Sequence, residues 1–119
     1  MSPGRNQTIG KWGEDQACLF LHRQGFRVIE RNFYTPTGEI DVVATKGGDY
    51  YFIEVKTRRK GELANDLSIT PAKKYKFLKT IKQYCFKRDV TTGGFIFAGL
   101  LVFVDRVTRQ VAFRLAVIY

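Results

Sequence analysis

Two short apolar runs on either side of a Gly-Gly pair constrain the fold of this chain most strongly. The runs are residues 42–44 and 51–53, and neither alternates between apolar and polar side chains. Continuous apolar strands are typical of a sheet that is covered on both faces. The connecting Gly47-Gly48 suits the positive φ angles of tight hairpin turns. The sequence therefore predicts a hairpin inside a sheet whose two faces are both buried.

The rest of the chain predicts two helices and further strands around this hairpin. Apolar residues recur at helical spacing over residues 8–24, with Thr8 as the capping residue and Gly25 as the stop. A second helix is expected from the Thr70-Pro71 pair to about Arg88. Strands are expected at residues 27–34, 39–45, 50–58, 95–105 and 110–118. The predicted order is helix, three strands, helix, two strands, which is an α/β arrangement.

Length and composition favour one cytoplasmic domain. The chain has 119 residues and 45% of them are apolar, which is enough for one core. We expect a single domain over residues 1–119, with residues 1–7 flexible. The longest apolar run, residues 95–104, is shorter than the roughly 20 residues of a membrane-spanning helix. Cys18 and Cys85 stand apart from other metal-ligand types and are expected to be reduced core residues.

The positive charge of the chain is confined to one segment. The formal net charge is +9, and the segment from Lys56 to Arg88 accounts for all of it, because basic and acidic residues balance elsewhere. A local basic excess is the electrostatic footprint of a protein that neutralises phosphates. A lysine-rich helix that is merely solvated would give the same count, and charge alone does not separate the two interpretations.

Two carboxylates are predicted to face each other across the hairpin. Counting back from the Gly-Gly turn places Asp41 opposite Glu54 and Glu39 opposite Lys56, with Glu39, Asp41 and Val43 on one face of their strand. Facing acids in a buried sheet must take up a proton, pair with cations or bind a metal. We therefore predict a divalent cation held by Asp41, Glu54 and the backbone carbonyl of Val55.

Magnesium is the expected ion, with Mn²⁺ as its substitute. Mg²⁺ takes oxygen ligands and is usually held by one or two carboxylates, waters and substrate phosphate. Lys56 would orient the attacking water or offset charge in the transition state. Glu14 lies beside the apolar face of the first helix and joins the site if that helix covers the same side of the sheet. The alternatives are a charge ladder that sets strand register and, for Glu14, an acid favoured by the helix dipole.

Four aromatic residues in the second helix interleave with lysines. They are Tyr75, Phe77, Tyr84 and Phe86. Such a pattern is compatible with stacking on nucleic-acid bases, but packing into the core is the favoured interpretation.

Several short motifs resemble the YraN-like family of small bacterial proteins. The motifs are Gly10-Lys-Trp-Gly13-Glu14, Gly25-Phe26, Arg31-Asn32, Gly38-Glu39-Ile40-Asp41, the run from Phe52 to Arg58, and Thr70-Pro71-Ala72-Lys73. That family is grouped with the PD-(D/E)XK nucleases, particularly the archaeal Holliday junction resolvases. The resemblance covers about residues 8–85 and implies a restriction-endonuclease-like core, a mixed five-stranded sheet flanked by helices. It also implies catalytic positions at Glu14, Asp41, Glu54 and Lys56.

Together these features predict a metal-dependent endonuclease that hydrolyses phosphodiester bonds in DNA, with branched, Holliday-junction-like DNA as a candidate substrate. DNA is favoured over RNA, and an enzyme that nicks two symmetric strands would work naturally as a homodimer. The residues expected to bind the phosphate backbone of the nucleic acid are Arg58, Arg59, Lys60, Lys73, Lys74, Lys76 and Lys79. The main alternative is a protein that binds nucleic acid through the same basic surface without cutting it. A structural role for the charge ladder is a third interpretation.

Overall fold

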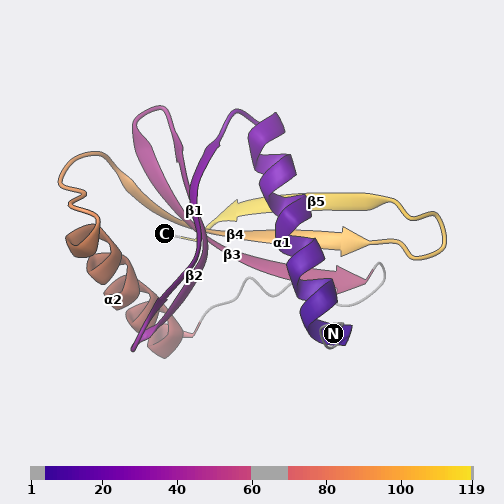
Figure 1. The fold of residues 1–119 in the computed structure, drawn as a ribbon, viewed down its shortest axis with the longest axis horizontal. Helices are drawn as coiled ribbons and strands as arrows, with labels where there is room; N and C mark the ends of the chain where they lie inside the picture. The colour runs from indigo at the N-terminus through magenta and orange to yellow at the C-terminus, as the bar shows by residue number, and fades with distance from the viewer. Residues whose placement is uncertain (1–4, 60–69, 119) are drawn as a thin grey trace.

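The described part of the chain forms two helices and five strands. The computed structural model describes residues 5–59 and 70–118, with side chains from Gly10 onward. Figure 1 shows the elements α1 (Arg5–Arg23), β1 (Arg27–Thr35), β2 (Gly38–Lys46), β3 (Asp49–Arg59), α2 (Pro71–Lys87), β4 (Phe95–Val104) and β5 (Val111–Val117). The predicted order of helices and strands is confirmed. Neither described helix has the length and hydrophobicity needed to span a membrane.

The strands form one mixed sheet in the order in which they occur in the chain. The order is β1-β2-β3-β4-β5, with β3 and β4 parallel and every other neighbouring pair antiparallel. Parallel neighbours require a long crossover connection. Here α2 lies within that connection, which also carries it to one face of the sheet.

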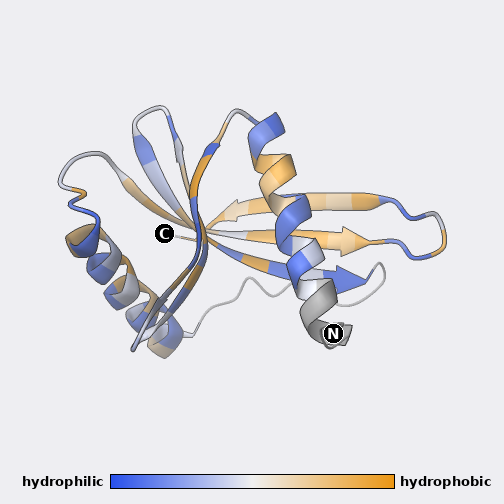
Figure 2. Ribbon diagram, viewed as in Figure 1, coloured by the Kyte–Doolittle hydropathy of each residue, from blue (hydrophilic) through white to orange (hydrophobic). Residues whose placement is uncertain are grey.

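The two helices cover opposite faces of the sheet. Ala17 and Leu21 of α1 pack against a cluster that includes Val42 and Ile53. Ile81 and Tyr84 of α2 pack against a second cluster, built around Phe33, Ile40, Val43, Phe52 and Phe97. In Figure 2 apolar stretches run along β4 and β5, where α1 crosses them, and apolar and polar residues alternate along both helices. Both cysteines are free and pack at the edges of these clusters, as predicted.

The hairpin of β2 and β3 opens before the two strands end. Their paired residues run from Lys46–Asp49 at the turn to Val42–Ile53. Beyond that point β2 stays paired with β1 as far as Gly38, while β3 stays paired with β4 as far as Arg59. Figure 1 shows the two strands separating, β2 toward α2 and β3 toward the N-terminal end of α1. The predicted pairing of Asp41 with Glu54 and of Glu39 with Lys56 is therefore wrong, because the sheet has a gap that starts next to Asp41 and Glu39 pairs with Tyr34 of β1 instead.

The regular pleat of β1 and β2 is interrupted close to Asp41, where the β2–β3 ladder ends. Asn32 has a left-handed φ of 54°, a conformation that Asn tolerates better than most residues. Ile40 and Val43 belong to the same apolar cluster although they are three residues apart. Strict alternation would place them on opposite faces. The prediction that Glu39, Asp41 and Val43 share one face of a regular strand is therefore wrong.

Helix α1 begins earlier than the sequence indicates. It starts at Arg5, so Thr8 lies inside the helix and is not its cap. Helix propensity is a weak signal, and a threonine inside a helix costs little. Residues 1–4 lie outside the described part of the chain. The cap predicted for α2 is confirmed, because the Thr70 hydroxyl accepts a hydrogen bond from the Lys73 N–H.

A glycine sets the distance between α1 and β3. A Cβ atom placed on Gly13 would overlap Thr57 Oγ1 and come within 3.3 Å of Thr57 Cβ. Gly10 lies one helical turn earlier, and a Cβ there would meet no atom within 4 Å. The missing side chain at Gly13 therefore lets the helix approach the strand at the residue before Glu14.

Replacing Gly13 tests this contact. We expect Gly13→Ala to be less stable than Gly10→Ala by about 1–3 kcal/mol in urea unfolding, because overpacking forces the helix off the strand. Gly10→Ala is the matched control and should be neutral or stabilising by up to about 1 kcal/mol through helix propensity. Removing the Thr57 hydroxyl with Thr57→Ala should reduce the cost of Gly13→Ala. Equal stability of the two single variants would show that Gly13 does not set this distance.

Candidate active site

The gap between β2 and β3 is a pocket that collects the predicted catalytic residues. Its volume is about 510 Å³. The lining comes from α1, β2 and β3 and consists of Gly10, Glu14, Glu39, Asp41, Glu54, Val55, Lys56, Thr57 and Arg58. The four residues named as catalytic candidates from the sequence, Glu14, Asp41, Glu54 and Lys56, are thus brought together. They arrive from three elements that meet only in the folded chain.

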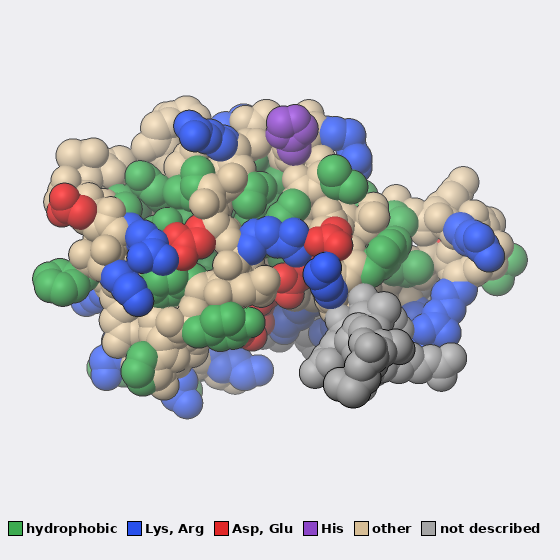
Figure 3. Space-filling model, viewed as in Figure 1, with side chains coloured by type: hydrophobic (Ala, Val, Ile, Leu, Met, Phe, Trp, Pro, Cys, Tyr) green, Lys and Arg blue, Asp and Glu red, His purple; other side chains and the backbone are tan. Residues whose placement is uncertain are grey.

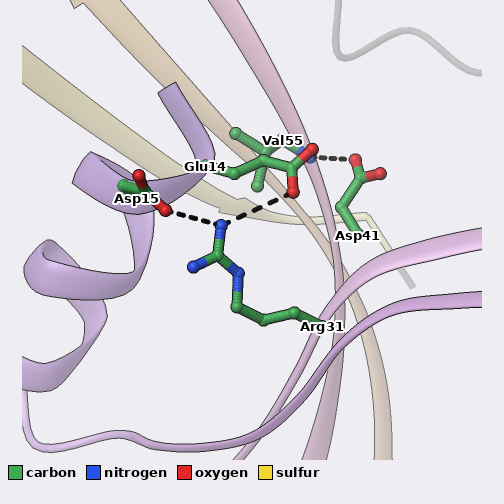
Figure 4. A network of polar contacts seen from close by, with 5 residues as sticks. All are labelled: Glu14, Asp15, Arg31, Asp41 and Val55. Atoms are coloured by element: carbon green, nitrogen blue, oxygen red, sulfur yellow. Dashed lines mark hydrogen bonds and ion pairs between the residues drawn. The ribbon is translucent and has the colours of Figure 1, made fainter. Parts of the chain in front are cut away.

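Asp41 lies at the point where the two strands separate. Its Oδ2 atom accepts a hydrogen bond of 2.8 Å from the N–H of Val55, as Figure 4 shows. In a continued ladder that N–H would face a carbonyl of β2. The carboxylate therefore replaces the missing strand partner, which satisfies a backbone donor and fixes the side chain at the mouth of the gap.

The surroundings of Asp41 disfavour its negative charge. Burial, together with the nearby carboxylates of Glu14, Glu39 and Glu54, raises its pKa from the ordinary 3.8 to about 7. The hydrogen bond from Val55 opposes this shift but does not cancel it. Desolvation and like charges both penalise the ionised form. Without a cation, Asp41 therefore holds a proton over much of the acidic range.

Glu14 is held over the pocket by an arginine from β1. The Arg31 Nη2 atom lies 3.8 Å from Glu14 Oε1 and 2.8 Å from Asp15 Oδ1 (Figure 4). Burial raises the pKa of Glu14, while the charge of Arg31 and a hydrogen bond from the Asn32 side chain lower it. Arg31 Nε is buried and has no hydrogen-bond partner among the described residues. One guanidinium thus orients two neighbouring acids of α1.

Arg31 and Asn32 were not identified as site residues from the sequence. The Arg31-Asn32 pair was noted only as part of a family resemblance. The signal that could have found them is the polar run from Glu30 to Asn32, which interrupts a strand with apolar residues before it, at Val28, and after it, at Phe33. The strand alone does not reveal that this arginine meets α1, because that contact depends on how the helix crosses the sheet.

The basic residues predicted to bind nucleic acid are divided between two regions. Arg58 lines the pocket, and its Nη1 donates to the Thr57 carbonyl at 3.0 Å. Arg59 is exposed at the end of β3, whereas Lys60 falls outside the described residues. The other four lie on α2, where Lys74 is half-buried and the rest are exposed; they are Lys73, Lys74, Lys76 and Lys79. In Figure 3 basic and apolar side chains gather over α2, while acidic and basic groups alternate across the middle of this face.

Comparison with known proteins places the chain in a family. The profile of the uncharacterised protein family UPF0102 matches residues 13–118. A UPF0102 protein from Helicobacter pylori strain J99 is 46% identical over 86 residues, which is 71% of this chain and 73% of the relative. A UPF0102 protein from Wolinella succinogenes is 35% identical over 108 residues, which is 87% of this chain and 98% of the relative. The matched region includes every candidate residue of the pocket, and the chain belongs to the UPF0102 family.

Proposed function

We propose that this protein is a metal-dependent nuclease that hydrolyses phosphodiester bonds in DNA. The observation that carries the proposal is the pocket at the open end of the β2–β3 hairpin, where the half-buried Asp41 lies among other carboxylates and Lys56 lines the same cavity. A chain that needed only stability would gain nothing from gathering like charges there. The arrangement is useful if a cation and a phosphate complete it.

The fold supports the same assignment. The order of elements, the mixed five-stranded sheet and the helices on both faces are those that the PD-(D/E)XK resemblance implies. So are the positions of the acids, with Glu14 on the first helix, Asp41 on the second strand and Glu54 on the third. We therefore propose a restriction-endonuclease-like core. Because a shared fold does not establish an activity, the argument rests on the pocket.

The residues present fit a magnesium ion. Burial and the neighbouring carboxylates raise the pKa of Asp41, and acids outnumber bases in the pocket lining, so a bound cation would favour the ionised carboxylate. In the described part of the chain no three His, Cys, Asp or Glu side chains form a ready ligand cluster. Mg²⁺ does not need one, since two carboxylates with waters and phosphate suffice. We assign Asp41, Glu54 and the Val55 carbonyl as ligands, because a strand residue presents its N–H and C=O to the same neighbour.

Each side chain of the pocket then has a distinct task. When bound, the ion would polarise the phosphate and lower the pKa of an attacking water. The Val55 N–H holds the Asp41 carboxylate in place before substrate arrives. The Lys56 ammonium group, next but one after Glu54 on β3, would offset the charge that develops on the reacting phosphate. Arg31 keeps Glu14 at the rim, where its carboxylate can accept hydrogen bonds from water.

Contacts to the DNA backbone would come from the basic residues near the pocket and from α2. Arg58 lines the pocket itself and is therefore the nearest candidate for the phosphate next to the reacting one. The net charge of +9 favours binding that weakens steeply as salt is added. These contacts carry no base specificity, so the preferred DNA structure must depend on other parts of the surface.

Substitution of the acids and the lysine tests the proposed chemistry. We expect Asp41→Asn, Glu54→Gln and Lys56→Met each to lower Mg²⁺-dependent cleavage of labelled DNA by about 100-fold or more, the scale of losing one group that stabilises the transition state. Glu30→Gln is the matched control, because Glu30 is an acid of β1 that pairs with Arg88 outside the pocket. Linear and branched duplexes should be compared.

The same assay separates catalysis from simple binding. If the wild-type protein binds DNA in a salt-sensitive manner but yields no product with Mg²⁺ or Mn²⁺, the protein is a binding protein and the nuclease proposal is wrong. Cleavage that persists in both Asp41→Asn and Glu54→Gln would exclude these carboxylates from the reaction.

The pKa of Asp41 predicts how stability depends on pH and on metal. The folded protein binds the Asp41 proton more tightly than the unfolded chain, so this residue makes stability fall as pH rises from about 4 through about 7. We expect Asp41→Asn to lose less stability than wild type between about pH 5 and pH 8, measured by thermal unfolding in EDTA. Adding Mg²⁺ at the higher pH should stabilise wild type but not Asp41→Asn. Identical dependence of stability on pH in the two proteins would show that the pKa of Asp41 is not raised in the folded state. Equal stabilisation of the two proteins by Mg²⁺ would show that Asp41 is not a metal ligand.

A further inference from the structure

A second cavity lies between the end of the β1–β2 hairpin and α2. Its volume is about 530 Å³, within the range of about 300–1,000 Å³ that is usual for small-ligand pockets. Phe33, Pro36 and Phe86 supply apolar walls, and Lys82 and Lys87 lie on the α2 side. No acidic side chain lines it among the described residues. The cavity is thus an apolar groove with a positively charged border.

Two aromatic rings of this groove are unusually exposed. The exposed fraction is 91% for Phe86 and 68% for Tyr34. Phe77 and Tyr84 of the same helix are core residues by contrast, because Phe77 stacks on Phe97 with 3.8 Å between ring centroids and Tyr84 is only 2% exposed. The structure therefore divides the aromatic residues of α2, and packing does not account for Phe86.

The walls of the groove are held in a fixed relation. The Thr37 hydroxyl of the β1–β2 turn donates to Gln83 Oε1 of α2 at 2.9 Å. It also lies 3.1 Å from the Thr80 hydroxyl, which is buried. The turn forms one wall of the cavity and the helix forms the other, and these contacts join the two walls. A ligand would therefore meet a preformed surface and would not have to order it.

The groove is connected to the active-site pocket through one residue pair. Tyr34 lines the groove and is paired with Glu39, which lines the pocket. The carboxylates of Glu39, Glu14 and Asp41 raise the pKa of the Tyr34 hydroxyl, which shows that this ring lies within the field of the pocket. A polymer with its phosphate in the pocket would have to pass Tyr34 to reach the groove.

We infer that this groove binds an unpaired nucleotide of the nucleic acid whose phosphate lies in the active-site pocket. The base would stack on Phe86 or Tyr34, and Lys82 and Lys87 would contact the adjacent phosphates. A base within a duplex is stacked on its neighbours and cannot enter, so the groove selects DNA with a single-stranded segment, such as a flap or a branch. This inference rests on the proposed nuclease function and specifies its substrate class.

A protein segment is the other kind of occupant that an apolar groove accepts. The position of the groove favours a nucleotide, because its Tyr34 is paired with Glu39 of the proposed phosphodiester site. Among the described residues, its only charged lining residues are two lysines. A protein ligand would not make DNA binding depend on Phe86.

The test measures binding without cleavage. Labelled blunt DNA duplex and the same duplex with a single-stranded tail are titrated in EDTA with wild type, Phe86→Ala, Phe86→Trp and Tyr75→Ala. Phe86→Ala should weaken binding of the tailed duplex by about five- to 100-fold, the range for loss of one stacked base, and change blunt-duplex binding by less than about twofold. Phe86→Trp keeps a stacking ring and should restore the preference. Tyr75 is the matched control, since it is 64% exposed on the same helix but does not line the groove.

The two proposals fail in different ways. If DNA is cut with Mg²⁺ but Phe86→Ala binds tailed and blunt duplexes as wild type does, the groove assignment is wrong and the nuclease proposal stands. Equal weakening for both duplexes would also overturn the groove, because it indicates a general backbone contact. If no DNA is cut but the tail preference depends on Phe86, the groove assignment stands and the nuclease proposal falls. Thermal unfolding checks that each variant is folded, which the exposure of Phe86 leads us to expect.

Discussion

The hydrogen bond between Asp41 and the Val55 N–H is the interaction on which the rest of the site depends. A regular hairpin would have paired these strands to their ends and left no cavity between them. Here the ladder stops at Val42–Ile53, and the carboxylate occupies the position of the next backbone partner. An orphaned N–H inside a sheet would be costly, so the opening of the strands and the position of the acid stabilise each other. The gap is therefore a fixed part of the fold.

This arrangement makes the pocket electrostatically unfavourable in isolation. Four acids from α1, β2 and β3 surround one cavity, and burial together with the neighbouring carboxylates raises the pKa of Asp41 to about 7. Arg31 compensates part of the charge, but its guanidinium lies against Glu14 and Asp15 on the helix side. In the pocket lining itself the acids Glu14, Glu39, Asp41 and Glu54 outnumber the bases Lys56 and Arg58. An uneven distribution of this kind is expected of a site whose missing charge is supplied by a ligand, because a purely structural network would be neutralised throughout.

Much of the fold could be predicted because local signals agreed with one another. The Gly-Gly turn set the register from Lys46–Asp49 to Val42–Ile53, and the unbroken apolar runs indicated helices on both faces. The end of the β2–β3 ladder and the change of face near Asp41 could not be predicted from the sequence, because a strand pattern indicates only a regular alternation of side chains between the two faces. They lie level with Asn32, whose left-handed backbone the sequence analysis did not predict. The role of Arg31 was missed for a related reason, because it depends on the crossing of α1 over β1.

The separation of β2 from β3 also explains why two different cavities lie so close together. Once it leaves β3, the paired tip of β1 and β2 approaches α2, and the Thr37 hydroxyl anchors it there. The open side of the tip then faces the acids of the pocket, and the opposite side faces the aromatic groove, with Tyr34 and Glu39 paired between them. A departure from regular pairing at one residue thus creates a charged cavity and an apolar one on the two sides of a single hairpin. A nucleic-acid strand likewise carries charged phosphates and flat, largely apolar bases. The proposed substrate could therefore place a phosphate in the charged cavity and a base in the apolar one.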